Sequence, residues 1–167
     1  MPSIAQKIAP CLWFDTQAEE AARFYVSVFL NAKLGRISHY GNEGQNIHGK
    51  ASGMVMVAEF TLEGQNFVAL NGGPHFTFDE AVSFQVFCET QDEIDYYWSR
   101  LGDGGKYGPC GWLKDRFGLS WQVVPSVVPD MMTDPDRAKS DRVMKAILQM
   151  KKIDLAVLRR AYDDAEP

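Results

Sequence analysis

The chain has 167 residues, the length of one ordinary domain or of two very small modules that share a core. Hydrophobic residues make up 46% and aromatic residues 12% of the chain, which excludes a mainly disordered protein. The 17 basic and 22 acidic residues give a net charge of −5, which argues against nucleic-acid binding through a basic face.

Three further features bear on where the protein works. No run of about 18 apolar residues occurs in the sequence, so no transmembrane helix and no membrane partner are expected. The opening segment Met1–Lys7 lacks a long apolar stretch, so no secretion signal is expected. Cys11, Cys88 and Cys110 are odd in number and form no CxxC pair, which is typical of free thiols in a reducing compartment. We therefore expect a cytoplasmic protein.

The first half of the chain predicts a strand, a helix and three more strands. Ile8–Phe14 is a short aromatic run, which favours a strand. Thr16–Glu19 has the form of a capping box and is followed by apolar residues at helical spacing, which predicts an amphipathic helix of about three turns. Leu34–Tyr40 predicts a second strand, and the Gly- and Asn-rich stretch Gly41–Gly49 predicts a loop.

A hairpin completes this half. Met54–Leu62 and Phe67–Leu70 are strand-like runs on either side of Glu63–Asn66, a turn pattern. The half therefore has the order β-α-β-β-β and ends at Asn71–Pro74.

The second half repeats that order. Val82–Cys88 predicts a strand, and Thr90–Glu93 is a second capping box that begins a helix. The glycine-rich turn Gly102–Gly105 leads into short extended pieces. Asp115–Gly118 predicts a turn, and Leu119–Val124 predicts the last strand.

The pair Thr16-Gln17 recurs as Thr90-Gln91, 74 residues further along, with strand, cap and helix in the same order. This internal repeat predicts an α+β fold built from two tandem βαβββ modules. The expected organisation is a paired domain over residues 1–128, with modules at about 5–74 and 80–126, and a C-terminal helical extension over residues 129–167.

The extension contains two helical stretches, the first of which begins at Asp134-Pro135. We interpret it as a docking element that covers an exposed sheet edge or a dimer interface, with a partner-binding arm as the alternative. Paired βαβββ modules leave sheet edges and an apolar face to be covered, so a homodimer is expected.

An ordered set of motifs carries a resemblance to a known family. The motifs are Leu12–Asp15, Glu19–Tyr25, Leu70–Pro74, Ser83–Val86, Cys110–Trp112 and Asp115–Gln122. Over roughly residues 5 to 162 the chain resembles the vicinal oxygen chelate superfamily, which includes glyoxalase I and bleomycin- and fosfomycin-resistance proteins. In detail it is similar to the PhnB-like branch, often labelled 3-demethylubiquinone-9 3-methyltransferase. The resemblance implies that the two modules form an open barrel with a cleft.

Metal-dependent members of that superfamily hold a divalent ion with four ligands in the cleft. By resemblance, those positions fall at Ile8 or Pro10, at Val82–Phe84, at Val68–Leu70 and at Gln122. Only Gln122 is a plausible ligand, and one ligand does not hold an ion. We therefore predict no metal and no cofactor. An atypical metal site that includes Gln122 and His75 is the alternative.

The resemblance places five residues near the mouth of the cleft, where they would contact a small organic molecule: Trp13, Asn71, Ser83, Trp112 and Gln122. Alternatives stay open for three of them. Trp13 also fits a hydrophobic core, Asn71 also fits a turn, and Gln122 also fits a contact with ordered water.

No catalytic residue is assigned, and whether the protein is an enzyme is left open. Cys110 is the best candidate nucleophile, with a plain buried thiol as the alternative. The methyltransferase label meets an objection, because neither Gly72-Gly73 nor Gly104-Gly105 lies in a strand-to-helix turn of the nucleotide-binding type. A non-catalytic dimeric interaction module is a further alternative.

Overall fold

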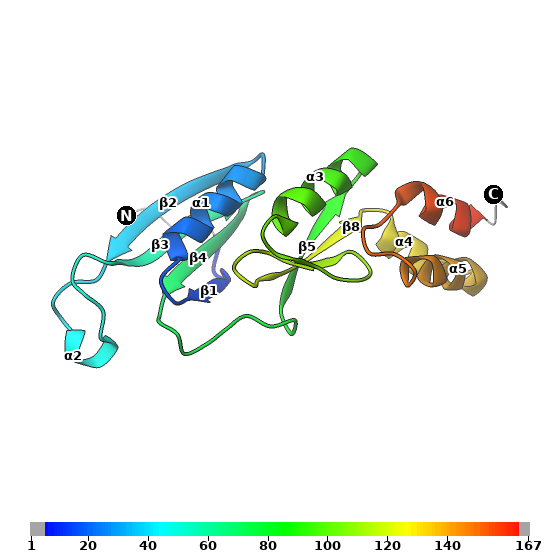
Figure 1. Ribbon diagram of the computed structural model, residues 1–167. Coiled ribbons are helices and arrows are strands. Elements are labelled where there is room, and N and C mark those ends of the chain that lie inside the picture. Colours follow the sequence, from blue (N-terminus) through cyan, green and yellow to red (C-terminus); the bar gives the residue numbers. More distant parts are fainter. Residues whose placement is uncertain (1–5, 164–167) are drawn as a thin grey trace. The chain divides into compact units, whose positions relative to one another are not determined.

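The computed structural model describes residues 6–163, and the chain divides into two compact units (Figure 1). Unit 1 comprises residues 1–77 and unit 2 comprises residues 78–167. Residues 1–5, which belong to the segment considered above for a secretion signal, lie outside the described residues, as do residues 164–167. Across residues 6–163 no helix has the length and apolar character needed to cross a membrane.

Unit 1 is a four-stranded sheet with one long helix against it (Figure 1). The strand order is β1-β4-β3-β2, with β1 parallel to β4 and the other neighbours antiparallel. The elements are β1 (Cys11–Phe14), α1 (Ala18–Val28), β2 (Ala32–His39), α2 (Gln45–His48), β3 (Val55–Leu62) and β4 (Gln65–Asn71).

The core of unit 1 lies between α1 and the sheet. Small residues of α1 are fully buried and let the helix approach the strands closely. The Tyr25 ring stacks on Phe60 with centroids 5.8 Å apart, and Phe60 stacks on Phe67 at 5.1 Å. This aromatic row joins α1 to β3 and β4.

The predicted capping box at Thr16–Glu19 is wrong. The helix begins at Ala18, and no side chain of the N-cap residue bonds to it. Instead, the Ala18 amide donates to Oδ1 of Asn71 at 2.8 Å. Asn71 can reach the helix because it ends β4 opposite Phe14, the last residue of the parallel strand β1. The Glu19 carboxylate forms an ion pair with Arg23, with 2.7 Å between Oε1 of Glu19 and Nη2 of Arg23.

The stretch Gly41–Gly49, predicted to be loop, contains the four-residue helix α2. Gly44 and Gly49 flank this helix, and both have left-handed backbone conformations with φ of 76° and 67°. Glycine adopts this region without a steric penalty, so two glycines allow a single helical turn to start and stop within a loop.

Unit 2 repeats the architecture and adds three helices at its C-terminal end (Figure 1). Its sheet has the order β5-β8-β7-β6, with β5 parallel to β8. The elements are β5 (Ser83–Cys88), α3 (Gln91–Gly102), β6 (Lys106–Tyr107), β7 (Trp112–Lys114), β8 (Ser120–Pro125), α4 (Val128–Met132), α5 (Arg137–Ile147) and α6 (Leu155–Asp163).

The second capping box is confirmed. The Glu93 amide donates to Oγ1 of Thr90 at 3.2 Å, and the Thr90 amide donates to the Glu93 carboxylate at 3.3 Å. Both units have the predicted βαβββ order along the chain. In each sheet the last strand of the unit lies between the first and the third, so β4 lies between β1 and β3, and β8 lies between β5 and β7. The α+β fold class is confirmed.

The C-terminal helices have a small core of their own. Met131, Val143, Ile153 and Leu158 form it and are buried. The side chain of Asp136 caps α5 by accepting from the Ala138 amide at 3.0 Å. The homodimer stays a prediction.

Candidate ligand pocket in unit 2

One face of the unit 2 sheet lies against α3, and we call the opposite side the open face. Neighbouring residues on a strand point to opposite sides of a sheet, and Val86 and Val123 are buried on the α3 side. The open face therefore carries two registered rows. The first row is Gln85, Gln122 and Trp112, and the second is Ser83, Ser120 and Lys114.

A polar network runs across β5 and β8 on this face. Nε2 of Gln122 donates to Oγ of Ser83 at 2.8 Å. Nε2 of Gln85 donates to Oε1 of Gln122 at 3.3 Å. Both ends of the Gln122 amide are therefore engaged by neighbouring side chains, which fixes its orientation in the sheet.

A pocket of about 470 Å³ opens beside this network. That volume lies within the range of small-molecule sites. The lining combines aromatic and apolar groups with three charged side chains and a serine: Glu80, Lys106, Tyr107, Gly108, Pro109, Trp112, Leu113, Lys114 and Ser120. Every one of these residues belongs to unit 2.

The pocket has an excess of positive charge. Lys106 and Lys114 are directly opposite each other on β6 and β7, an arrangement in which like charges repel. Nζ of Lys114 lies 2.7 Å from Oε1 of Glu80. The hydrogen bond from Lys114 is the main reason that the pKa of Glu80 lies below its ordinary value, with attraction to Lys106 a smaller cause. Two ammonium groups and one carboxylate leave one net positive charge to attract an anion.

A buried aspartate holds β8 in place. Asp115 is 3% exposed, and its Oδ1 accepts from the amides of Phe117 and Leu119 at 2.8 and 3.1 Å. Its Oδ2 accepts from Nε1 of Trp121 at 2.8 Å. The turn predicted at Asp115–Gly118 is confirmed, and its side-chain bonds fix the strand that carries Ser120 and Gln122.

Trp13, one of the five predicted site residues, packs on a turn of its own unit. Its Nε1 donates to the carbonyl of Gly73 at 2.8 Å, and its ring meets Phe76 edge-on with centroids 5.0 Å apart. A Cβ atom added to Gly72 would lie 2.2 Å from the Trp13 ring. The ring therefore occupies the space that Gly72 leaves free.

Asn71 is 2% exposed and is held by the backbone on both sides of its amide. Its Oδ1 accepts from Ala18, and its Nδ2 donates to the carbonyl of Val55 at 2.9 Å. Its own carbonyl accepts from the Tyr40 hydroxyl at 2.6 Å. Asn71 thus ties together α1, β3 and the end of β2.

Of the five predicted site residues, Ser83 and Gln122 are in contact, and Trp112 pairs with Gln122 across the strands. Trp13 and Asn71 lie in unit 1. Lys106, Lys114 and Glu80 belong to none of the motifs in the sequence. A signal for Lys114 exists, because alternate residues of a strand share a face and Lys114 is two residues after Trp112.

Metal-dependent members of the superfamily that the sequence resembles hold a divalent ion, so the candidate metal donors of this chain were compared with what such an ion requires. The candidate donors in unit 2, Ser83 and Gln122, are neutral and are hydrogen-bonded to each other. The matching stretch of unit 1, Val68–Leu70, is apolar. In the part of the chain that the structure describes, no three His, Cys, Asp or Glu side chains come close enough to hold an ion. The donor set does not fit a divalent metal.

His48, Cys110 and Cys88 each have specific surroundings. In the His48 ring, Nε2 lies 3.1 Å from the Glu43 carbonyl and Nδ1 accepts from the Lys50 amide at 3.0 Å. Cys110 is half-buried and has φ of 57°, in the left-handed region. Burial raises the pKa of the Cys88 thiol to about 12, so Cys88 is an inert core thiol.

The fold was compared with solved structures. A PhnB protein from Bacillus cereus, whose description names a 3-demethylubiquinone-9 3-methyltransferase, is 36% identical with a TM-score of 0.62, over 72% of this chain and 99% of that chain. The protein PA1353 from Pseudomonas aeruginosa is 20% identical with a TM-score of 0.59, over 72% of this chain and 98% of that chain. The fosfomycin resistance protein FosX from Mesorhizobium loti is 13% identical with a TM-score of 0.54, over 79% of this chain and 100% of that chain.

Two βαβββ units and these neighbours define the class as the glyoxalase and bleomycin-resistance fold of the vicinal oxygen chelate superfamily. A family model described as 3-demethylubiquinone-9 3-methyltransferase matches residues 6–124, and the chain belongs to that family in its PhnB-like branch. No curated protein matches the chain.

Proposed function

We propose that unit 2 binds a small organic anion with a flat apolar body in the pocket beside Trp112, without a metal. The observation that carries the proposal is the cross-strand pair Lys106 and Lys114 beside an aromatic side chain in a pocket of about 470 Å³. An aromatic wall buries the apolar body, and the unbalanced ammonium charge binds the anionic group.

The polar network would supply specificity next to that charge. Gln122 does not line the pocket itself, but it pairs directly with Trp112, which does, and its amide donates to the Ser83 hydroxyl. A ligand with one polar substituent can exchange a hydrogen bond with this network while its ring contacts Trp112. These contacts make Ser83, Trp112 and Gln122 the site residues of the proposal, together with the lysine pair.

The test is a calorimetric titration of the full chain with three probes of one shape: 2-naphthoate, 2-naphthamide and 2-naphthylmethylamine. We expect the carboxylate to bind about fivefold more tightly than the amide, because two partly exposed ion pairs contribute modestly. The amine should bind most weakly. Equal affinity for carboxylate and amide, or no binding of any probe, would contradict the proposal.

Variants locate the binding. Lys106→Gln and Lys114→Gln should each remove most of the preference for the carboxylate, whereas Lys145→Gln, an exposed lysine on α5, should leave it unchanged. An equal loss in all three variants would indicate non-specific charge attraction. The affinity should also be the same in EDTA, and a loss there would instead favour a metal-dependent enzyme.

Methyl transfer is a second candidate because the family description names it. The glycine pairs do not favour it, since each approaches its own chain closely. The Cβ position of Gly72 is 2.2 Å from Trp13, and that of Gly105 is 2.1 Å from the Lys114 carbonyl. We expect no saturable binding of S-adenosylmethionine in the same titration, and such binding would move the assignment to methyl transfer.

A further inference from the structure

The C-terminal extension contacts the turn that forms one wall of the pocket. The contacting residues are Met150–Leu155, which lead from α5 into the first residue of α6, and we call this segment the strap. The family model ends at residue 124, so the strap is outside the part that defines the family.

Backbone hydrogen bonds join the strap to the turn between β6 and β7. The Cys110 amide donates to the Met150 carbonyl at 2.8 Å, and the Gly111 amide donates to the Lys151 carbonyl at 2.7 Å. The strap residue Ile153 is 2% exposed, and its Cγ1 atom is 3.3 Å from the Cβ position of Gly111. The turn therefore rests directly on the strap.

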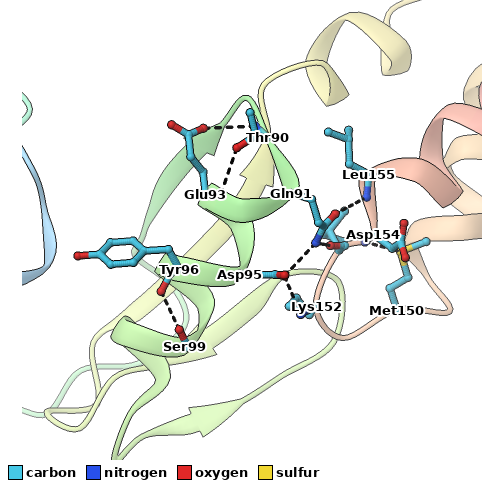
Figure 2. Close-up of polar contacts among 11 residues, drawn as sticks. Thr90, Gln91, Glu93, Asp95, Tyr96, Ser99, Met150, Lys152, Asp154 and Leu155 are labelled. Atoms are coloured by element: carbon cyan, nitrogen blue, oxygen red, sulfur yellow. Dashed lines mark hydrogen bonds and ion pairs between the residues drawn. The ribbon is translucent and has the colours of Figure 1, made fainter.

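Gln91, the first residue of α3, fixes the other side of the strap (Figure 2). Its Nε2 donates to the Ile153 carbonyl at 3.1 Å, and its Oε1 accepts from the Leu155 amide at 2.9 Å. Figure 2 also shows Asp95 between Gln91 and Lys152, with the Lys152 ammonium 2.6 Å from its carboxylate. One amide side chain thus pairs with two backbone groups of the strap.

The turn needs such support because of its backbone. Cys110 has φ of 57°, a region that residues with a Cβ rarely adopt. Gly111 follows with φ of 80°, and a Cβ there would lie 2.6 Å from the Val123 carbonyl. A strained non-glycine residue persists only where surrounding contacts hold it, and at Cys110 the strap supplies the contact to the amide.

Cys110 and Gly111 lie between two residues that line the pocket. Pro109 precedes them and Trp112 follows, and the Trp112 amide donates to the Pro109 carbonyl at 3.0 Å. The Gly108 amide donates to the Trp112 carbonyl at 2.8 Å and closes the turn. Any change in the backbone of Cys110 therefore moves Pro109 relative to Trp112.

We propose that the strap is a positioning element of the pocket, which holds Cys110 in its left-handed conformation and so sets the place of Pro109 and Trp112. Gln91 is the positioning residue that fixes the strap to α3. This inference goes beyond the proposed function, because it concerns the shape of the pocket wall whatever ligand the pocket takes.

The first test measures hydrogen exchange by NMR in the full chain. Gln91→Met keeps the length of the side chain and removes both strap bonds, so the amides of Cys110 and Gly111 should exchange about tenfold faster. Gln149→Met makes the same change at an exposed position next to the strap and should leave both amides unchanged. Unchanged exchange in Gln91→Met, or equal acceleration throughout unit 2, would overturn the proposal.

The second test asks whether the effect passes through Cys110. Cys110→Gly removes the penalty of the left-handed conformation, so the turn should depend less on the strap. Gln91→Met should weaken 2-naphthoate binding severalfold in the natural sequence and less than twofold in the Cys110→Gly background. Equal weakening in both backgrounds would contradict the route through Cys110.

The two tests separate the two proposals. Hydrogen exchange needs no ligand, so it decides the role of the strap even if 2-naphthoate fails to bind. Failure to bind would contradict the proposed function alone, whereas an unchanged exchange rate would contradict the strap alone.

Discussion

The two units have the same topology but differ at the same register position of their sheets. In unit 1, Cys11 lies three residues before the end of the first strand and pairs with Val68. In unit 2 the matching residue Gln85 pairs with Gln122, which in turn pairs with Trp112. Equivalent backbone positions thus carry an apolar pair in one unit and a hydrogen-bonded amide pair in the other.

The charges around these rows differ as well. In unit 1 the next residue in the row is Glu59, which Arg36 engages with two hydrogen bonds of 2.6 and 2.7 Å. In unit 2 Lys114 forms an ion pair with Glu80, and Lys106 opposite it adds a second positive charge. At this row of unit 1 a glutamate and an arginine offset each other, whereas in unit 2 the two lysines and one glutamate leave a positive charge in the pocket. This difference in charge is the reason that the proposed ligand site lies in unit 2 and not in unit 1.

The largest expected loss of stability comes from a substitution in the turn of unit 1 on which Trp13 packs. Gly72→Ala places a methyl group in the Trp13 ring, so either the ring or the turn must move. We expect a loss of about 3 kcal/mol in the free energy of unfolding, from overpacking at a half-buried tryptophan. Urea unfolding measures it.

Gly41→Ala is the matched control for that change. A Cβ at Gly41 meets no atom within 4 Å, so this variant should stay within about 0.5 kcal/mol of the natural protein. An equal loss in both variants would show that the contact with Trp13 is not the cause.

The next largest loss of stability concerns the N-terminal caps of α1 in unit 1 and α3 in unit 2. Asn71→Ala leaves the Ala18 amide without its acceptor in a buried position and also removes the bond to Val55. We expect a loss of about 2 kcal/mol in the free energy of unfolding, measured with urea. Asn46→Ala, at an exposed position on α2, should change little.

Thr90→Ala sharpens the same comparison from unit 2. Its cap bonds are local and exposed, so it should cost about 1 kcal/mol, less than Asn71→Ala. If Thr90→Ala were the more harmful of the two, the long-range cap of unit 1 would not be the stronger one.

These caps also show how far the sequence predicts the fold. The strands, the helices α1 and α3 and the local cap at Thr90 follow from patterns within a few residues, and the structure confirms them. The cap of α1 comes from Asn71, 53 residues away from Ala18, and only folding brings the two together. No local pattern contains that information, and the Thr16–Glu19 motif pointed to the wrong cap.

The candidate site shows the same limit. The resemblance places both Ser83 and Gln122 at one site, and the structure shows the hydrogen bond between them. Lys106 and Lys114 could not, since their pairing depends on the register of the two-residue strand β6. The turn at Cys110 joins β6 to β7, and its amides bond to the strap about 40 residues further along the chain, which no local pattern contains.

The smallest expected change in the free energy of unfolding concerns Asp95, which lies in the contact between α3 and the strap in unit 2. Hydrogen bonds from Lys152 and then from Gln91 hold the pKa of Asp95 below its ordinary value. A carboxyl group whose pKa is lowered by folding adds stability above its unfolded pKa of about 3.9 and loses it as the pH falls through the lower folded value.

Asp95→Asn tests this pH dependence. At pH 7 the variant should be less stable by under about 1 kcal/mol, because the pair is partly exposed and screened by solvent. The difference should shrink as the pH falls below about 4, because Asp95 then binds a proton in the unfolded chain and the advantage of the folded carboxylate is progressively lost. A difference that stays constant between pH 7 and pH 3 would contradict a contribution from the charge.

NMR mapping is the most direct test of a ligand site in unit 2. Titrating 2-naphthoate into the isotope-labelled full chain should shift the amide signals of Lys106, Trp112 and Lys114 in a saturable way. The signals of unit 1, those of Trp13 and Gly72 among them, should stay in place. Saturable shifts centred on Trp13, or no saturable shift at all, would contradict the account.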